Sequence, residues 1–470
     1  MIHRFIFNLI SAISLCVLSQ TVCADTSSSH TDKFISVADI HFNPFIGCKL
    51  STKPCELISK LRASDYQAWD SILDREGPKE VSKAGEDTNY PLFKSTLVEI
   101  KRVNEKDHVR FAIVLGDFLA HEFRMNYVTY SHDASSTGYQ AFIRKTLQFM
   151  SYKLKQALPD IDIYSVVGNN DSYTEDYGSV PHGAFYQETA QTWSKQIHDP
   201  ANRKHLLSDF PAGGYYAVTL SGQSQQRIII LNTVLFSTHA QGPDIDNAAK
   251  QELSWLHKQL ALAMKQKQHV LLLYHIPIGI DVYKTVQSKF GMIIEFWKPE
   301  YSKSFENELK NFAPVISAML PAHIHMDTFQ LLAVSQTSIL PVNFTPAISP
   351  VFFNNPGFKV FYYNSESLKL NNFDTYYFAL SATEGRAWQK EYSFNQIYQS
   401  NCKTCDLLMG MKQLTAHGLL SKYFKHYYAV GTNAQPITRK DAWIPYYWCN
   451  LREISSKDYR TCIKKDCGHL

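Results

Sequence analysis

Hydrophobic residues occur in short continuous runs, and longer amphipathic stretches separate these runs. Apolar runs of about four to eight residues predict buried strands, whereas apolar residues at a period near 3.6 predict helices. The two patterns alternate through the first two-thirds of the chain, and strand-like runs dominate afterwards. The predicted strands cover residues 34–38, 111–115, 161–167, 215–220, 227–231, 269–274, 315–320, 329–334, 358–363 and 375–380.

Helical patterns lie between these strands and return at the end of the chain. The stretches 125–138 and 281–300 are rich in polar and aromatic residues and predict loops. The predicted helices cover residues 51–62, 65–73, 92–104, 139–158, 183–207 and 251–265. This arrangement predicts an α/β protein with layered mixed sheets covered by helices. We expect one domain over residues 25–385 and a small helical, cysteine-rich domain over 386–470.

Side chains of the metal-binding type follow five of the predicted strands directly. In layered α/β proteins, ligands gather at the carboxyl ends of strands, so these side chains are expected to lie close together. Glycines precede two of them and allow the chain to turn sharply there. The candidate ligands are Asp39, His41, Asp117, Asn169, His275, His323 and His325.

The chemistry of this set favours two transition-metal ions. Carboxylate, amide and imidazole donors suit Zn, Fe or Mn. Seven donors are too many for one tetrahedral ion but suit two ions that share a carboxylate. Two ions about 3.5–4 Å apart clamp a phosphoryl group and activate the attacking hydroxide. Each piece alone also has a structural explanation, such as a capped turn for Asp39-x-His41 or a core histidine for His275.

Composition and charge limit the class of protein further. The chain has 470 residues, of which 45% are hydrophobic and 19% charged, which indicates a globular protein. The formal net charge is +4 with histidine neutral. This charge favours an anionic substrate. It does not provide the basic stripe of a nucleic-acid-binding protein.

The first residues have the pattern of a signal peptide. Arg4 precedes an apolar run over 5–18, and small residues precede a cleavage site after Ala24. Residues 1–24 are therefore predicted to direct export to the outside, the periplasm or an endolysosomal lumen. An uncleaved anchor is the alternative. No other stretch is apolar and long enough for a transmembrane span.

Export favours disulfides for the remaining cysteines. Cys48 and Cys55 are expected to pair, whereas five cysteines after residue 400 permit several pairings. Cys402 and Cys405 are also compatible with a zinc site or a redox pair. No second Cys-x-x-Cys accompanies them, so disulfides are preferred.

Motifs around the candidate ligands resemble those of calcineurin-like metallophosphoesterases. More narrowly, the chain resembles the acid sphingomyelinase-like phosphodiesterases, over roughly residues 33–385. The narrower resemblance rests on five segments, Gly116–Glu122, Leu231–Thr233, His275–Gly279, His323–Phe329 and Asn355–Val360.

The resemblance implies a sandwich of two mixed β-sheets flanked by helices, with the metals at one edge. By motif match, one ion would bind Asp39, His41 and His325. The other ion would bind Asn169, His275 and His323. Asp117 would bridge the two ions.

The chain departs from the family pattern at two positions. Asn170 follows Asn169 where the family has a histidine, and Ala322 replaces a glycine before His323. An amide donates a hydrogen bond but does not act as an acid near neutral pH. The resemblance therefore implies that His121, which matches a second family histidine, is the general acid. The alternative is that His121 is a loop histidine bonded to Glu122 or to a carbonyl.

These features predict an exported dinuclear-metal phosphodiesterase that cleaves a phosphodiester or phosphoanhydride, with His121 and Asn170 as catalytic candidates. A lipid head group or a soluble small molecule remains open as substrate, because no six-cysteine lipid-binding module is found. Polyphosphate or nucleotide pyrophosphate hydrolysis is the alternative, as is a catalytically weakened relative. The aromatic residues that either shape a leaving-group pocket or pack loops are Tyr127, Tyr130, Tyr283, Phe296 and Trp297.

Overall fold

The computed structural model describes residues 31–288, 291–380, 387–398, 406–416, 420–427, 429 and 442–466. The predicted signal peptide lies outside the described residues, as do Cys402, Cys405 and Cys467.

Two six-stranded mixed sheets form the centre of the molecule. In the first sheet, β1 is parallel to β2 and antiparallel to β10, and β2 is parallel to β3. The antiparallel pairs β10–β11 and β11–β12 complete its other side. Its strand order is β12–β11–β10–β1–β2–β3, with the bounds β1 (Thr31–Val37), β2 (Phe111–Val114), β3 (Asp162–Ser165), β10 (Gly357–Asn364), β11 (Leu370–Phe378) and β12 (Trp388–Ser393).

The second sheet contains the remaining strands. Its three central pairs, β5–β6, β6–β7 and β7–β9, are parallel, and the outer pairs β4–β5 and β8–β9 are antiparallel. Its order is β4–β5–β6–β7–β9–β8, with the bounds β4 (Tyr216–Thr219), β5 (Gln226–Ile230), β6 (His269–Leu273), β7 (Ile316–Leu320), β8 (Phe329–Ala333) and β9 (Ile339–Asn343). The predicted fold class, a layered sandwich of two mixed sheets, is confirmed.

Aromatic rings stack across the middle strands of the first sheet. The Phe34 ring lies 4.8 Å from that of Phe111 and 5.1 Å from that of Phe361, measured between centroids. All three side chains are fully or almost fully buried. Strands covered on both faces read as continuous apolar runs, which is why their positions were predictable from hydrophobicity alone.

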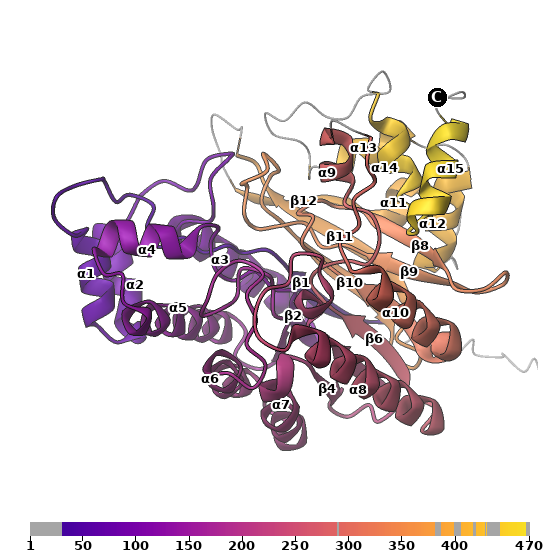
Figure 1. Cartoon of the computed structure of the whole chain (residues 1–470), viewed down its shortest axis with the longest axis horizontal. Helices are drawn as coiled ribbons and strands as arrows, with labels where there is room; N and C mark the ends of the chain where they lie inside the picture. The colour runs from indigo at the N-terminus through magenta and orange to yellow at the C-terminus, as the bar shows by residue number, and fades with distance from the viewer. Residues whose placement is uncertain are drawn as a thin grey trace, which may run out of the picture.

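The helices cover the sheets and extend the molecule at one end. In Figure 1, α1, α2, α4 and α5 form the end opposite the C-terminal helices, and α8 and α10 lie side by side along the second sheet. The first ten helices are α1 (Glu56–Ala63), α2 (Trp69–Glu76), α3 (Tyr90–Asp107), α4 (Phe123–Ser131), α5 (Ser136–Ala157), α6 (Ala184–Trp193), α7 (Pro200–Gly213), α8 (Ile245–Lys265), α9 (Val282–Gln287) and α10 (Pro299–Phe312).

The described C-terminal residues are mainly helical and pack against β11 and β12 of the first sheet and against β8 and β9 of the second. Strand β12, which follows residue 385, pairs with β11 and belongs to that sheet. The domain boundary near 385 stays a prediction. The helices here are α11 (Phe394–Tyr398), α12 (Leu407–Ala416), α13 (Leu420–Tyr427), α14 (Ile444–Cys449) and α15 (Ser456–Asp466).

Two predicted loops contain helices. The stretch 125–138 was expected to be a loop but largely forms α4 and the start of α5, and α9 occupies part of the stretch 281–300. The α4 sequence has only a weak amphipathic pattern, so packing of Phe123 and Tyr127 against α5 stabilises the helix. Strands β9 and β12 were not predicted.

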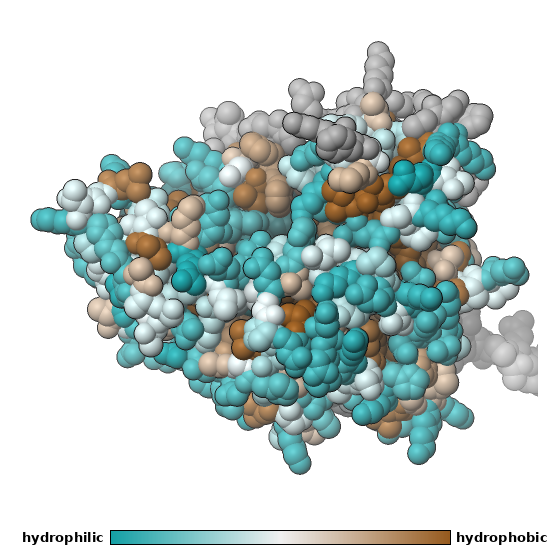
Figure 2. All heavy atoms as spheres, in the orientation of Figure 1, coloured by the Kyte–Doolittle hydropathy of each residue, from teal (hydrophilic) through white to brown (hydrophobic). Residues whose placement is uncertain are grey.

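Two disulfides lie in the described part of the chain. The predicted Cys48–Cys55 pair is present, and Cys449 pairs with Cys462 to connect α14 with α15. Among the described helices, none combines the length and hydrophobicity needed to cross a membrane. Polar residues predominate on the face shown in Figure 2, where apolar residues form separate groups.

Candidate metal centre

The predicted ligands lie in loops that leave neighbouring parallel strands. The loops after β1, β2 and β3 come from the first sheet, and those after β6 and β7 come from the second. Backbone hydrogen bonds join the loops directly, because the Asp39 N–H donates to the Gly116 oxygen at 3.1 Å and the His41 N–H donates to the Asp117 oxygen at 2.9 Å. The structure therefore brings segments from five regions of the sequence into one place.

The backbone is strained at five of these side chains. Asp39, His41, Asp117, His323 and His325 have φ values of 47°, 45°, 54°, 72° and 65°. Non-glycine residues adopt this left-handed region rarely, and such strain concentrates at functional sites. None of the five is a glycine, although Asp and His adopt this region more often than most other residues. The strain supports a functional role for this group of loops.

Two glycines permit the close approach of these loops. A Cβ on Gly168 would lie 2.1 Å from both the Asp117 nitrogen and its Oδ1. A Cβ on Gly116 would lie 2.7 Å from Nδ1 of His275, and Gly116 has a φ of 89°. Larger residues at either position would displace the side chains that surround Asp117.

Asp117 lies at the centre of the group. Its Oδ2 is 3.3 Å from Nε2 of His41 and 3.3 Å from Nε2 of His275. Nε2 of His275 is also 3.1 Å from Oδ1 of Asn169. Asp117, His275 and His323 offer ligand atoms that all lie within 4.8 Å of one another.

A second set of atoms converges beside the first. Nε2 of His41 lies 3.1 Å from Nε2 of His325, and the latter is 3.6 Å from Oδ1 of Asp39. Asp39, His41 and Asp117 also offer ligand atoms within 4.8 Å of one another. The two sets share Asp117, and the side chains of Asp39 and His41 are fully buried.

Burial disfavours isolated charges in this space, so each charge depends on an opposite charge beside it. Burial raises the pKa of Asp39 to about 8. Burial disfavours protonated His275, but the Asp117 charge prevails and raises the pKa of His275 to about 9. A divalent cation would supply the positive charge that these carboxylates otherwise obtain from protons.

The histidines in the second set are neutral and available as ligands. Burial lowers the pKa of His41 to about 4 and that of His325 well below its usual value. The Nδ1 atom of His41 lies 3.0 Å from the Leu119 oxygen, which leaves Nε2 free to face the site. Metal-binding histidines are commonly oriented by such a hydrogen bond at the other ring nitrogen. The residues present therefore fit two divalent ions.

Two further carboxylates hold the ligand loops, and sequence reasoning gave neither a role. Asp171 accepts hydrogen bonds from the backbone N–H groups of Phe118 at 2.8 Å and Gly168 at 2.9 Å. Asp176 accepts from Nδ2 of Asn169 at 2.7 Å and so turns the amide oxygen toward His275. Asp171 directly follows the Gly168-Asn169-Asn170 motif, which was the available signal for it.

His121 lies beside the second set of atoms. Its ring stacks on that of His41, with centroids 4.1 Å apart and planes inclined by 17°. Its Nδ1 lies 2.9 Å from Oδ1 of Asp87, and its backbone N–H donates to the other Asp87 oxygen at 3.1 Å. Burial lowers the pKa of His121, but the hydrogen bond and charge of Asp87 outweigh it, so the net pKa is raised. No sequence motif indicated a role for Asp87.

Asn170 points toward Asp117. Its backbone N–H donates to Oδ1 of Asp117 at 2.8 Å, and its Nδ2 donates to Oδ2 at 2.9 Å. One hydrogen of the side-chain amide is therefore bonded to the central carboxylate.

Aromatic side chains border the site unevenly. Tyr127 and Trp297, both candidates for a leaving-group pocket, are fully buried in the core. The Phe296 ring lies 5.4 Å from that of His323, and Phe352, which was not predicted, lies 4.7 Å from His325. Tyr283 is 55% exposed and lies 6.1 Å from Phe352. Tyr130 packs against Phe45.

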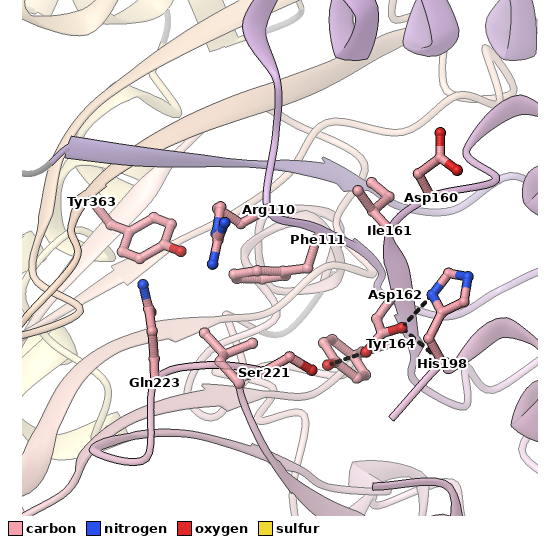
Figure 3. Close-up of a pocket in the computed structure, with 11 residues that line it drawn as sticks. Arg110, Phe111, Asp160, Ile161, Asp162, Tyr164, His198, Ser221, Gln223 and Tyr363 are labelled. Atoms are coloured by element: carbon pink, nitrogen blue, oxygen red, sulfur yellow. Dashed lines mark hydrogen bonds and ion pairs between the residues drawn. The ribbon is translucent and has the colours of Figure 1, made fainter. Parts of the chain in front are cut away.

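A separate cavity of about 250 Å³ opens at the opposite ends of these strands, near the starts of β2 and β3. It contains none of the predicted site residues. His198 and Tyr164 both bond to Asp162 there, as Figure 3 shows. The residues that line the cavity are Arg110, Phe111, Asp160, Ile161, Asp162, Tyr164, His198, Leu220, Ser221, Gln223 and Tyr363.

The two-sheet sandwich and the Asp, Asn and His side chains at its strand ends have the arrangement expected of a calcineurin-like metallophosphoesterase. No protein-family model matches the chain. Curated relatives narrow the class: the chain is 22% identical to mouse acid sphingomyelinase-like phosphodiesterase 3b over 448 residues, 92% of this chain and 90% of the relative. The resemblance to acid sphingomyelinase-like phosphodiesterases is therefore confirmed over most of the chain.

Other relatives have related names. The chain is 25% identical to human cyclic GMP-AMP phosphodiesterase SMPDL3A, over 92% of this chain and 90% of the relative. It is also 25% identical to sphingomyelinase phosphodiesterase D of Dictyostelium discoideum, over 78% and 80% of the two chains. These similarities support the predicted enzyme class, a metal-dependent phosphodiester hydrolase.

Solved structures with a detectable likeness include a dimetal phosphatase from Danio rerio, with 12% identity and a TM-score of 0.39 over 76% of this chain and 98% of that one. The structure of PhoD has 12% identity and a TM-score of 0.42, over 77% of this chain and 69% of that one.

Proposed function

We propose that this protein is an exported phosphodiesterase that uses two divalent transition ions, with zinc as the preferred metal. The convergence of six Asp, Asn and His side chains around Asp117 is the observation that carries the proposal. When bound, two such ions activate water for attack on phosphorus and neutralise the charge of the phosphoryl group. Disulfides in the described part of the chain support export.

In this proposal the ligands divide into two sets around Asp117. Asp39, His41 and His325 hold one ion, and Asn169, His275 and His323 hold the other. The short distances of Asp117 Oδ2 to His41 and His275 support a bridging position for this carboxylate. Asn170 then orients the bridging carboxylate, because its backbone N–H and its side-chain amide each donate a hydrogen bond to one Asp117 oxygen.

His121 is the proposed proton donor to the leaving group. The Asp87 carboxylate accepts the Nδ1 proton of His121, so the imidazole presents Nε2 away from Asp87. The raised pKa of His121 favours the protonated form that a general acid requires. The hydrogen-bond partner of the His121 ring is thus Asp87, in place of Glu122 or a carbonyl, the alternatives considered from the sequence.

The names of the relatives point to phosphodiesters of nucleotides or of phospholipid head groups as substrates. The exposed Phe352 ring lies beside His325, and the exposed Tyr283 ring lies 6.1 Å from that of Phe352. These rings support a substrate whose leaving group has a flat or apolar part. No substrate within this class is preferred further.

Hydrolysis of phosphoanhydrides, such as nucleoside polyphosphates or polyphosphate, is the second candidate function. Asn170 favours it, because loss of an imidazole is least costly when the leaving group is a phosphate that needs little protonation.

A panel of substrates tests both candidates. Purified full-length protein, loaded with Zn²⁺, is compared on sphingomyelin, a cyclic dinucleotide, nucleoside di- and triphosphates and polyphosphate. The proposal predicts hydrolysis of at least one phosphodiester, which the Asp117→Ala variant loses. If only anhydrides are cleaved, the second candidate replaces the first. If the metal-loaded protein cleaves none of them, it is a catalytically weakened relative.

A further inference from the structure

Asp327 connects the loop of the proposed ligands His323 and His325 to the rest of the fold. Its carboxylate is buried, and its Oδ1 accepts a hydrogen bond from Nζ of Lys359 at 2.6 Å. Its Oδ2 accepts from Oγ1 of Thr375 at 2.7 Å and from the hydroxyl of Tyr392 at 3.0 Å. These partners come from β10, β11 and β12 of the first sheet, whereas Asp327 precedes β8 of the second.

Helix α13 adds a contact from the C-terminal region. The backbone N–H of Asp327 donates to the Tyr427 oxygen at 3.0 Å. The His426 ring stacks on that of Tyr392 with centroids 4.1 Å apart, and Nδ1 of His426 lies 2.6 Å from Glu391. The Tyr392 hydroxyl that bonds to Asp327 is therefore itself held by residues that follow the predicted domain boundary.

The ion pair between Asp327 and Lys359 fixes this contact strongly. Lys359 is fully buried, its Nζ also donates to the Phe344 oxygen at 2.7 Å, and it lies 4.0 Å from the centroid of the Phe373 ring. A buried ammonium without its carboxylate is costly, so the pair resists separation. Movement of Asp327 away from the first sheet would leave that charge uncompensated.

His325 depends on this contact because its ring lacks the Nδ1 hydrogen bond that orients His41 and His275. Leu119 and Leu115 provide carbonyl oxygens at 3.0 Å and 2.7 Å from Nδ1 of His41 and His275, respectively. In contrast, Nδ1 of His325 is buried and has no hydrogen-bond partner among the described residues. Its orientation must come from the backbone of the loop, which has a φ of 65° at His325.

We propose that Asp327 is a positioning residue for metal binding, and that β12 and α13 act on the metal centre through it. The inference rests on the proposed function, since His325 must be a ligand for its position to matter. By this inference, residues that follow position 385 contribute to metal binding. Metal affinity, rather than the fold alone, is the property that Asp327 and its partners control.

The test removes the two hydroxyl hydrogen bonds to Asp327 and keeps its ion pair with Lys359. Thr375→Val and Tyr392→Phe are combined in the full-length chain, and each removes one hydroxyl with little change in shape. Tyr363→Phe is the matched control, because Tyr363 is a fully buried β10 residue whose hydroxyl has no partner among the described residues. Zn²⁺ affinity is measured by competition with a chromophoric chelator, after circular dichroism confirms that each metal-free protein is folded.

The double variant is expected to bind at least one Zn²⁺ roughly tenfold more weakly than the wild type, as loss of outer contacts to a metal ligand does elsewhere. The Tyr363→Phe variant is expected to bind Zn²⁺ like the wild type. Equal affinity in the double variant and the control would overturn the inference. Tyr392→Phe alone, with half the change, keeps the test valid if the double variant does not fold. A wild-type chain that binds no Zn²⁺ contradicts the proposed function itself, which is a distinguishable result.

Discussion

The carboxylate of Asp87 holds the imidazole of His121 from two sides. One oxygen lies 2.9 Å from Nδ1 of the ring, and the other accepts the backbone N–H of the same residue at 3.1 Å. The ring is thereby fixed in one tautomer beside His41, on which it stacks. Asp87 therefore orients His121, the proposed catalytic acid.

Replacement of Asp87 tests that orientation. In Asp87→Asn the acceptor of the Nδ1 proton is weakened and the ring is free to adopt the other tautomer. We expect kcat/KM for a phosphodiester to fall roughly a hundredfold, within the range of general acid catalysis. The bound metal should stay unchanged. Asp74→Asn, which removes an exposed partner of Lys94, is the control and should retain full activity.

The loss of activity on replacement of His121 should depend on the leaving group of the substrate. A basic alkoxide leaving group needs a proton, whereas a nitrophenolate departs without one. For His121→Gln we expect a loss of roughly a hundredfold or more on an alkyl phosphodiester and a much smaller loss on its nitrophenyl analogue. Steady-state rates on the two substrates measure this difference. Equal losses on both would remove His121 from the role of acid.

The close approach of two ligand loops should make Gly168 intolerant of any side chain. A Cβ there would meet Asp117 at 2.1 Å, so Gly168→Ala is expected to abolish metal binding and activity. In Gly222→Ala the new Cβ meets nothing within 4 Å, but the φ is 76°. That control should lose about 1 kcal/mol of stability from backbone strain and keep its metal. Bound metal and the urea midpoint of each variant give the comparison; a metal-loaded, active Gly168→Ala protein would contradict the geometry.

Glu252 should make the stability of the fold depend on pH. The side chain is fully buried on α8 and accepts the Asn232 N–H at 2.7 Å, and burial raises its pKa well above the usual value. The folded state therefore keeps a proton that the unfolded state has lost. Its contribution to stability is complete below the unfolded pKa and declines as pH rises toward the folded pKa.

Glu252→Gln keeps the acceptor oxygen but removes this titration. Relative to the wild type, the variant should gain stability as pH rises from about 5 to 8, by up to about 1.4 kcal/mol for each pH unit inside the window. Urea unfolding at several pH values measures the difference. A difference that does not change with pH would show that Glu252 is ionised in the folded protein.

The sequence was sufficient for most of the strands and for the closeness of the proposed ligands, because both depend on local patterns. Metal binding by these side chains stays a prediction. Each proposed ligand lies in the short loop after a buried apolar run, so its position near a strand end could be predicted without knowledge of the packing. The turn at Asn169 and the glycine before it belong to the same short segment. Layered mixed sheets could likewise be expected from apolar runs that alternate with helical patterns, whereas a sandwich of two sheets was implied only by the family resemblance.

Contacts between distant segments could not be predicted in this way. Asp87 lies in the loop before α3, and only the fold brings it to His121. Strand β12 has exposed polar residues and gains its structure from pairing with β11. Strand β9 contains Pro341, which argues against a strand in a single sequence. The role of Asn170 also needed the structure, because its hydrogen bonds to Asp117 depend on two loops meeting.

Metal content tests the central claim most directly, namely that Asp117 and the six side chains around it hold two ions. The purified full-length protein is incubated with Zn²⁺, freed of excess metal by gel filtration and analysed by inductively coupled plasma mass spectrometry, beside the Asp117→Ala variant. The account predicts close to two Zn²⁺ per wild-type chain and a loss of both in the variant, because Asp117 contacts both sets of ligands. A folded wild-type chain with one ion or none, or a variant that keeps two, would contradict it.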